Sequence, residues 1–194
     1  MNQSKVIGLT GGSGSGKTTV ASIFKEQGAY IIDADKVSHN LTDSDHTVLN
    51  KIKEEFSEKV FEEGVLSRKA LGKIVFEDKT KLEKLNKILH PKIAEKISDM
   101  VNKSGSDIVV IDAPLLFDVN DILSLCDTTV AVCASDEKRI KRIMSRDGLN
   151  YDEAIARIDS QRPQDDLARL ADFVITNDDD IEKLRSVVVD YLGK

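Results

Sequence analysis

One glycine-rich stretch constrains this chain more than any other, namely LTGGSGSGKTTV from Leu9 to Val20. Four glycines and two serines fill the six positions from Gly11 to Gly16. Glycine inside a regular element is about 0.5 to 1 kcal/mol less favourable than alanine, so such a run does not serve the stability of the fold. It indicates instead that another group approaches the backbone closely.

The stretch matches the pattern GxxxxGK[ST] and stands between an apolar strand pattern and a helical pattern. Glycines allow successive backbone N–H groups to converge on phosphate oxygens, and the helix N-terminus adds partial positive charge. We expect Lys17 to reach the β and γ phosphates and the Thr18 hydroxyl to bind Mg²⁺. The predicted ATP-binding residues of the stretch are Gly11, Gly12, Ser13, Gly14, Ser15, Gly16, Lys17, Thr18 and Thr19.

Short β-branched runs alternate along the chain with segments of helical period, which predicts an α/β fold with parallel strands. Apolar runs without alternation are typical of strands that are covered on both faces. We therefore predict a five-stranded parallel sheet with helices on both faces, as in P-loop kinases. The predicted strands are 5–10, 30–33, 107–112, 128–133 and 173–177.

A length of 194 residues favours a single domain with an inserted lobe. Helical patterns fill the long interval between the second and third strands, at 48–56, 68–76, 82–89 and 93–101. We predict a helical lobe at about 40–104 that binds a second substrate. A helix at 137–147 and the polar stretch after it predict a lid at about 146–170.

Composition excludes several function classes. The chain carries 28 basic and 34 acidic residues, a net charge of -6, which argues against broad contact with nucleic acid. No apolar run is long enough for a membrane span, and the start MNQSKVIG lacks the pattern of a signal peptide. We expect a cytoplasmic protein without a membrane partner, and a monomer or at most weak self-association. Cys133 is expected to be a small buried apolar residue.

Carboxylates follow the second and third strands. In DADKV, Asp33 and Asp35 stand at positions i and i+2, which face the same way in a strand, so we expect both to point into the cleft at the carboxyl edge of the sheet. One could orient or deprotonate an acceptor hydroxyl while the other holds water on Mg²⁺. The alternative is a turn with a cap for a helix that begins near Lys36. Asp112 stands where a Walker B carboxylate would, and Pro114 breaks the chain at the cleft.

His90 precedes Pro91, a residue that suits the first turn of a helix. Its imidazole would then lie at a helix entrance, where it could bind a ligand or cap the helix.

Arginines recur at helical spacing near the start of the lid and continue inside it. Phosphoryl transfer is helped by cations over the transferring group, so each is a candidate for γ-phosphate contact, with a solvated helix face as the alternative. Because a lid cation acts once the site has closed, we assign Arg146 to catalysis and Arg142 to ATP binding. The full set is Arg139, Arg142, Arg146, Arg162 and Arg169.

No guanine-reading NKxD sequence follows the fourth strand, which disfavours a GTPase. The order of motifs resembles that of the dephospho-CoA kinase family. The resemblance spans residues 7–178 and rests on LTGGSGSGKTTV, IDADKVSHNL, ILHPKI, APLLFD, IKRIMSRD and DSQRPQDDLARLADFVITND. Other nucleotide kinases and an ATP-binding regulatory protein are the competing hypotheses, and turnover of an acceptor panel separates them.

The resemblance implies ATP-dependent phosphorylation of the ribose 3′-hydroxyl of dephospho-CoA, the last step of coenzyme A synthesis, with Mg²⁺. It implies that Asp35 is the base-like catalytic carboxylate, beside Lys17 and Arg146. Asn177 would border the adenine, with a simple turn residue as the alternative. The implied substrate-binding residues are Asp33, Asp35, His90, Pro114 and Leu115, and the implied metal residues are Thr18 and, through water, Asp33 and Asp112.

The chain departs from the family pattern at two positions. Many members have arginine where this chain has His39, and glutamate where it has Asp118. Neither residue is therefore assigned a role.

Overall fold

The structure is a computed structural model that describes residues 4–193. Part of the amino-terminal segment MNQSKVIG lies outside the described residues. The chain divides into two compact units. We call the residues up to Ile32 and from Val101 onward the core unit, and Asp33–Met100 the insert unit.

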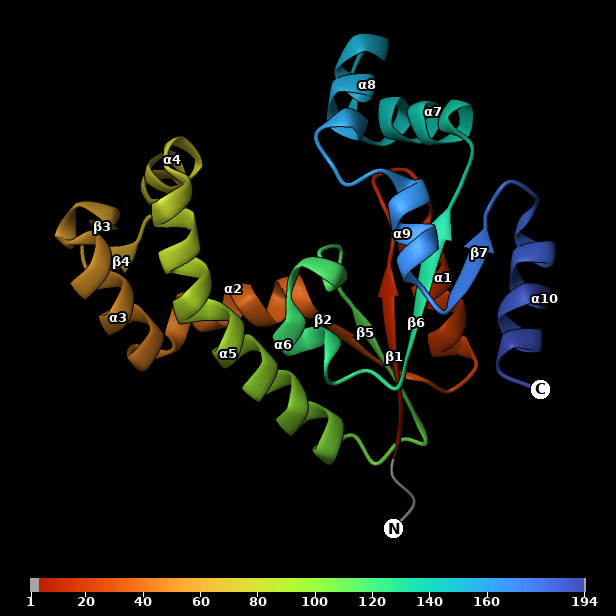
Figure 1. Cartoon of the computed structure of the whole chain (residues 1–194), viewed down its shortest axis with the longest axis horizontal. Helices are drawn as coiled ribbons and strands as arrows, with labels where there is room; N and C mark the ends of the chain where they lie inside the picture. Colours follow the sequence, from red (N-terminus) through yellow and green to blue (C-terminus); the bar gives the residue numbers. More distant parts are fainter. Residues whose placement is uncertain (1–3, 194) are drawn as a thin grey trace. The chain divides into compact units, whose positions relative to one another are not determined.

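A five-stranded sheet organises the core unit, in the order β2-β5-β1-β6-β7. β1 pairs in parallel with β5 and β6, and β6 pairs in parallel with β7, so β1 is central (Figure 1). The predicted parallel sheet is confirmed, although β5 begins one residue later and β7 ends one residue earlier than predicted. The strands are β1 (Lys5–Thr10), β2 (Tyr30–Asp33), β5 (Ile108–Asp112), β6 (Thr128–Cys133) and β7 (Phe173–Thr176).

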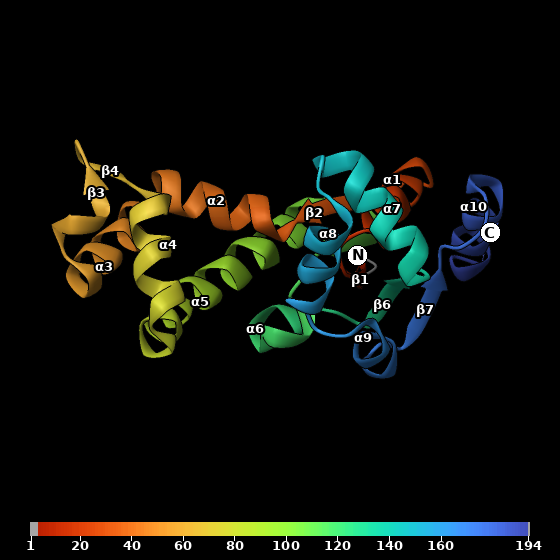
Figure 2. The same ribbon diagram turned by 90° about the horizontal axis from the view of Figure 1, so that it is seen from above.

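Helices cover both faces of this sheet, as predicted (Figure 2). On one face, α1 (Lys17–Glu26) and α10 (Ile181–Tyr191) bury Phe24 and Val188 against the strand residues Leu9 and Val130. On the other lie the 3₁₀ helix η2 (Leu116–Asp118), α6 (Asn120–Leu123) and α9 (Gln164–Leu170). This double cover explains why the strand runs are apolar without alternation.

Two further helices lie past the carboxyl ends of β1 and β6 (Figure 1). They are α7 (Asp136–Asp147) and α8 (Tyr151–Asp159), which pack through a small apolar cluster around Ile143 and Ala154. α8 begins with a capping box, in which Asn150 and Glu153 each accept the other's backbone N–H. The predicted lid at about 146–170 comprises the end of α7, α8 and α9.

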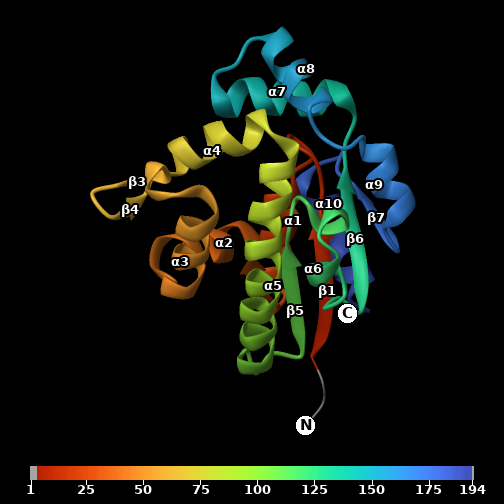
Figure 3. The same ribbon diagram turned by 60° about the vertical axis from the view of Figure 1, so that its left-hand side comes forward.

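The insert unit is helical apart from one short hairpin, which projects from one end of the unit (Figure 3). The predicted insert at about 40–104 overlaps this unit, and its role in binding a substrate stays a prediction. The elements are α2 (Ala34–Ser44), α3 (His46–Phe56), η1 (Glu58–Val60), β3 (Phe61–Glu62), β4 (Val65–Leu66), α4 (Arg68–Glu77) and α5 (Lys79–Lys103), the last ending in the core unit.

The prediction of two helices separated at Pro91 is wrong. α5 is continuous, and Pro91 lies inside it. An interior proline costs about 3 kcal/mol because it removes a backbone donor and crowds the preceding turn. Buried apolar residues on both sides, Leu85 before it and Ile97 after it, hold the two halves in one helix. His90 therefore lies mid-helix and not at a helix entrance.

Within residues 4–193, none of the helices combines the length and the apolarity that a membrane span requires.

Candidate active site

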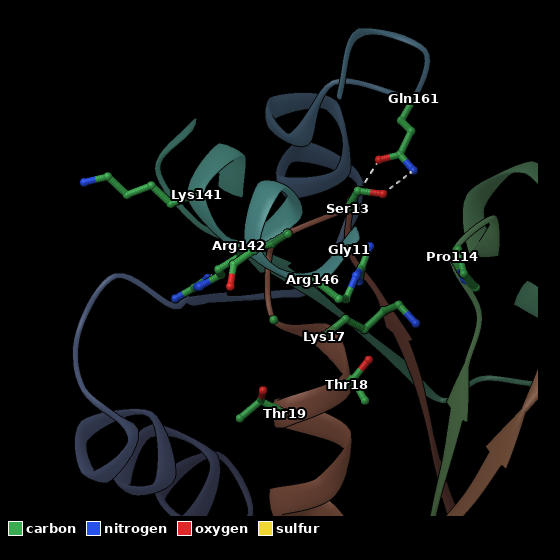
Figure 4. A pocket seen from close by; sticks show the side chains of 14 residues that line it. Gly11, Ser13, Lys17, Thr18, Thr19, Pro114, Lys141, Arg142, Arg146 and Gln161 are labelled. Atoms are coloured by element: carbon green, nitrogen blue, oxygen red, sulfur yellow. Dashed lines mark hydrogen bonds between the residues drawn. The ribbon is translucent and has the colours of Figure 1, made fainter. Parts of the chain in front are cut away.

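A pocket of about 690 Å³ opens over the glycine-rich loop between β1 and α1 (Figure 4). The loop, α7 and the turn after α8 together form most of its wall. The residues that line it are Gly11, Gly12, Ser13, Gly14, Gly16, Lys17, Thr18, Thr19, Pro114, Lys141, Arg142, Ser145, Arg146 and Gln161.

The backbone of the loop presents a set of open donors. The N–H of Ser15 donates to Gly12 O at 3.1 Å. The N–H groups of Gly14, Gly16, Lys17 and Thr18, by contrast, donate to no acceptor among residues 4–193. Lys17 and Thr18 begin α1, and the first N–H groups of a helix have no intrahelical partner. These donors, with the positive end of the helix dipole, make an anion-binding cradle.

Close packing against other parts of the core unit explains two of the glycines. A Cβ at Gly14 would lie 2.5 Å from the carbonyl oxygen of Arg139, and one at Gly16 would lie 2.0 Å from Nδ2 of Asn177. Both glycines also have positive φ, 77° and 90°. The close approach that the sequence indicated therefore comes in part from α7 and from the residue after β7.

Two arginines of α7 hold the outer side of the loop. The Nε of Arg139 donates to Ser13 O at 3.1 Å, and one nitrogen of Arg142 donates to Gly14 O and Ser15 O at 3.1 and 3.3 Å. Because these loop carbonyls bind the two arginines, the neighbouring N–H groups of the loop remain for the pocket. Arg139 is only 3% exposed and does not line the pocket, so its observed contact is with the loop backbone, and contact with the γ-phosphate stays a prediction.

Asn177 fixes the same loop from the end of β7. Its side chain is buried, and its Nδ2 donates to Ser15 O at 2.8 Å. The backbone carbonyl of Asn177 accepts a hydrogen bond from Arg142 at 2.9 Å. Contact with an adenine ring stays a prediction, while the observed contact is with the loop backbone.

Lys17 and Asp112 form an ion pair beside the loop. Asp112 is the last residue of β5, which pairs with β1, so the strand order brings the Walker B position next to the loop lysine. The two side chains are only 16% and 14% exposed. Lys17 also lines the pocket.

The remaining predicted arginines differ in their surroundings. Arg146 lines the pocket and makes two hydrogen bonds to Asp147, at 2.8 and 2.9 Å. These bonds lower the pKa of Asp147 and raise that of Arg146. Arg162 pairs with Asp118, and Arg169 pairs with Asp166, outside the set of lining residues. Of the five candidates, Arg142 and Arg146 therefore reach the pocket.

Sequence reasoning missed three polar residues of the pocket, Lys141, Ser145 and Gln161. Of these, Gln161 contacts the glycine-rich loop directly. Its Oε1 accepts the Ser13 N–H at 2.8 Å, and its Nε2 donates to the Ser13 hydroxyl at 3.0 Å (Figure 4). The residue was visible only as one letter of the motif DSQRPQDD. A glutamine in a polar stretch has no periodicity that could indicate its partner, 148 positions away.

The carboxylates after β2 are arranged differently from the prediction. β2 ends at Asp33 and α2 begins at Ala34, so Asp35 lies in the first turn of a helix and the strand argument for a shared direction is wrong. The alternative of a helix cap is correct for Asp33, whose Oδ1 accepts the Lys36 N–H at 3.0 Å.

Two candidates follow β5. Pro114 lines the pocket, and its carbonyl accepts a hydrogen bond from the Thr10 hydroxyl at 3.0 Å. Leu115 is 64% exposed.

Oxygen donors at the pocket and beside it are of the kind that a magnesium ion arriving with a nucleotide would take. Hydroxyl and carboxylate oxygens, here those of Thr18 and Asp112, are the ligands that Mg²⁺ prefers. No cluster of three or more histidine, cysteine or acidic side chains that could hold a metal occurs in the part of the chain that the structure describes. Mg²⁺ typically keeps several waters and binds through one or two protein groups and the substrate phosphates.

The sequence model of the dephospho-CoA kinase family matches residues 5–183. The chain belongs to the dephospho-CoA kinase family. It is 40% identical to the dephospho-CoA kinase of Carboxydothermus hydrogenoformans over 97% of this chain and 93% of that one. Its fold is similar to the crystal structure of a Thermus thermophilus protein, with a TM-score of 0.83 and 29% identity over 98% of this chain and 97% of that one. It is also similar to dephospho-CoA kinase from Campylobacter jejuni (TM-score 0.69, 31% identity, 97% and 95% covered).

The family's reaction is the ATP-dependent phosphorylation of dephospho-CoA on its ribose 3′-hydroxyl, the final step of coenzyme A biosynthesis. The chain is accordingly a phosphotransferase whose substrates are ATP and dephospho-CoA. The kinase reading of the ordered motifs is thus confirmed, and the reading as a regulatory ATP-binding protein is not supported.

Proposed function

We propose that the pocket over the glycine-rich loop holds the phosphates of ATP for transfer to the 3′-hydroxyl of dephospho-CoA. The observation that carries this proposal is the convergence of four open backbone donors with the Lys17 ammonium group at the start of α1. These donors and the ammonium group favour an anionic ligand over a neutral one.

On the nucleotide side, Lys17 binds the β and γ phosphates and leaves its ion pair with Asp112 to do so. Thr18 and, through water, Asp112 and Asp33 hold Mg²⁺. When bound, the ion neutralises charge on the β and γ phosphate oxygens. Arg146 stabilises charge on the transferring group, and Arg142 and Asn177 act at the nucleotide through the loop that they hold.

On the acceptor side, Asp35 orients the 3′-hydroxyl and takes up its proton as the oxygen bonds to the γ-phosphorus. The bond from that phosphorus to the bridging oxygen breaks, and ADP leaves. His90, Pro114 and Leu115 bind the acceptor. These roles rest on the motifs IDADKV, ILHPKI and APLLFD.

A cytoplasmic location, a monomeric state and the absence of nucleic-acid and membrane partners complete this proposal. They rest on the charge and composition of the chain. Gel filtration over a range of concentrations tests the monomer.

The test of the reaction is coupled ADP release with ATP, Mg²⁺ and one acceptor at a time. We expect turnover with dephospho-CoA and little with adenosine, AMP, uridine or pantothenate, and a product whose new phosphate is on the ribose 3′ oxygen. Comparable turnover of AMP or uridine would contradict the proposal, as would tight ATP binding without any acceptor turnover.

The test of the base is Asp35→Asn, which keeps the shape of the side chain and removes its charge. We expect kcat to fall about 10²-fold with nucleotide affinity almost unchanged. Asp45→Asn is the matched control, because Asp45 caps α3 in the same unit through Thr47 and Val48. A folded Asp35→Asn enzyme with the kcat of the control would rule out the catalytic role.

A further inference from the structure

Two neighbouring residues of the turn between α8 and α9 contact two different elements of the core unit. Gln161 binds Ser13 of the glycine-rich loop through both its oxygen and its nitrogen, at 2.8 and 3.0 Å (Figure 4). Arg162 forms an ion pair with Asp118 in η2, which follows β5. The turn is therefore attached at once to the glycine-rich loop, which lines the pocket, and to η2, which follows the lining residue Pro114.

Ser13 is held by protein at three atoms. Gln161 binds its N–H and its hydroxyl, and Arg139 donates to its carbonyl at 3.1 Å. The N–H groups from Gly14 to Thr18, except that of Ser15, are open. The loop thus has two parts, a rim at Ser13 fixed by the lid and by α7, and a floor whose donors are left for phosphate.

The second attachment uses a residue for which the motifs gave no role. Asp118 lies at the end of η2, close in sequence to Pro114, which lines the pocket. Asp118 and Arg162 are 40% and 37% exposed, so the pair is a surface contact of modest strength. The guanidinium of Arg162 has a raised pKa because of this hydrogen bond.

We propose that Gln161 and Arg162 are positioning residues that fasten the lid to the glycine-rich loop and to η2, so that the loop rim stays in place and water is excluded during phosphoryl transfer. Neither residue needs to touch the reacting atoms. This inference rests on the proposed function of the pocket and adds two residues to it. A loosened lid should leave the floor donors able to bind ATP while it lowers transfer and admits water to the γ-phosphate.

The decisive variant is Gln161→Ala, with Gln164→Ala as matched control. Gln164 lies in the same segment, but its side chain accepts the N–H of Ala134 at 3.3 Å and does not contact the loop. For Gln161→Ala we expect a roughly tenfold lower kcat, from the loss of two hydrogen bonds, with the KM for ATP changed less than about threefold. Water should also replace the acceptor more often in Gln161→Ala, so the ratio of ATP hydrolysis to transfer to dephospho-CoA should rise.

Asp118 and Arg162 are tested by exchange of their charges. Asp118→Arg alone and Arg162→Asp alone should each lower kcat about two- to fivefold and raise the hydrolysis ratio. The double variant with both changes should return both quantities to within about twofold of the starting enzyme. Equal losses in the single and double variants would overturn the role of this pair.

A measurement independent of the acceptor separates this inference from the proposed function. In Gln161→Ala the amide of Ser13 should exchange its hydrogen faster than in Gln164→Ala, followed by NMR without substrates. Failure of the starting enzyme to phosphorylate dephospho-CoA would remove the proposed function. Normal turnover of dephospho-CoA with identical kinetics, hydrolysis ratio and Ser13 exchange in the two glutamine variants would overturn only the positioning role.

Discussion

Two helices of this chain follow strands of the same sheet, and their first turns are built in opposite ways. α1 begins after Gly16, which offers no side-chain cap, and the N–H groups of Lys17 and Thr18 remain open. α2 begins after Asp33, whose carboxylate accepts the Lys36 N–H. The uncapped N-terminus of α1 can bind an external anion, whereas the N-terminus of α2 already binds the carboxylate of Asp33. The pattern of caps therefore distinguishes a helix start that offers backbone donors from one that offers carboxylate oxygens.

The largest expected effect tests the open start. Lys17→Ala should lower kcat by about two orders of magnitude or more, because the ammonium group stabilises the transition state more than the ground state. Steady-state kinetics measures the loss, and a thermal melt checks that the variant is folded. Near-normal kcat in a folded variant would mean that the start of α1 does not hold the transferred phosphate.

The next prediction concerns the shape of the loop. Gly14→Ala should weaken ATP binding about tenfold or more, because its Cβ would meet the backbone of Arg139 and its φ is positive. Gly28→Ala is the matched control, since Gly28 also has positive φ, 94°, but nothing lies within 4 Å of its Cβ position. Calorimetric titration with ATP should find a normal Kd for the control. Equal affinities in the two variants would contradict the packing argument.

A third prediction separates two arginines that the sequence could not distinguish. Arg142→Ala releases the carbonyls of Gly14 and Ser15, so the KM for ATP should rise about tenfold and Tm should fall. Arg146→Ala should instead lower kcat about tenfold with the KM for ATP within about threefold, because its side chain is more exposed and holds no loop carbonyl. The reverse assignment of KM and kcat effects would show that Arg142 is the transferring-group contact.

Local patterns predicted the sheet and the loop well, for physical reasons. A strand covered on both faces needs a continuous apolar run, and the five runs were all recognisable, with boundary errors of one residue. The GxxxxGK[ST] motif of the glycine-rich loop is typical of a turn between a strand and a helix, so it predicts both neighbouring elements as well. The hairpin of β3 and β4 was missed because each strand has only two residues and its turn is Glu63-Gly64, not a typical turn pair.

Contacts between distant residues could not be predicted in the same way. Helical spacing placed Arg139, Arg142 and Arg146 on one helix face, but it could not show that Arg139 and Arg142 hold the loop backbone and Arg146 does not. The attachment of Gln161 to Ser13 is likewise a property of the assembled fold. Pro91 misled the prediction because a local preference for helix starts was outweighed by burial on both sides of it.

The smallest predicted effect tests the capped start. Asp33→Ala should lower the free energy of unfolding by about 1 kcal/mol, because the Lys36 N–H loses its acceptor, whereas Asp33→Ser keeps a capping oxygen and should be within about 0.5 kcal/mol of the starting protein. The two variants share the loss of the carboxylate, so any raised Mg²⁺ requirement should appear in both. Chemical denaturation measures the first quantity and a Mg²⁺ titration of kcat the second. If the Mg²⁺ requirement rises only in Asp33→Ala, the variant that also loses stability, Asp33 acts as a helix cap and not at the metal. A change shared by both variants would mean that this carboxylate both caps α2 and serves the metal, which is the property that sets the start of α2 apart from that of α1.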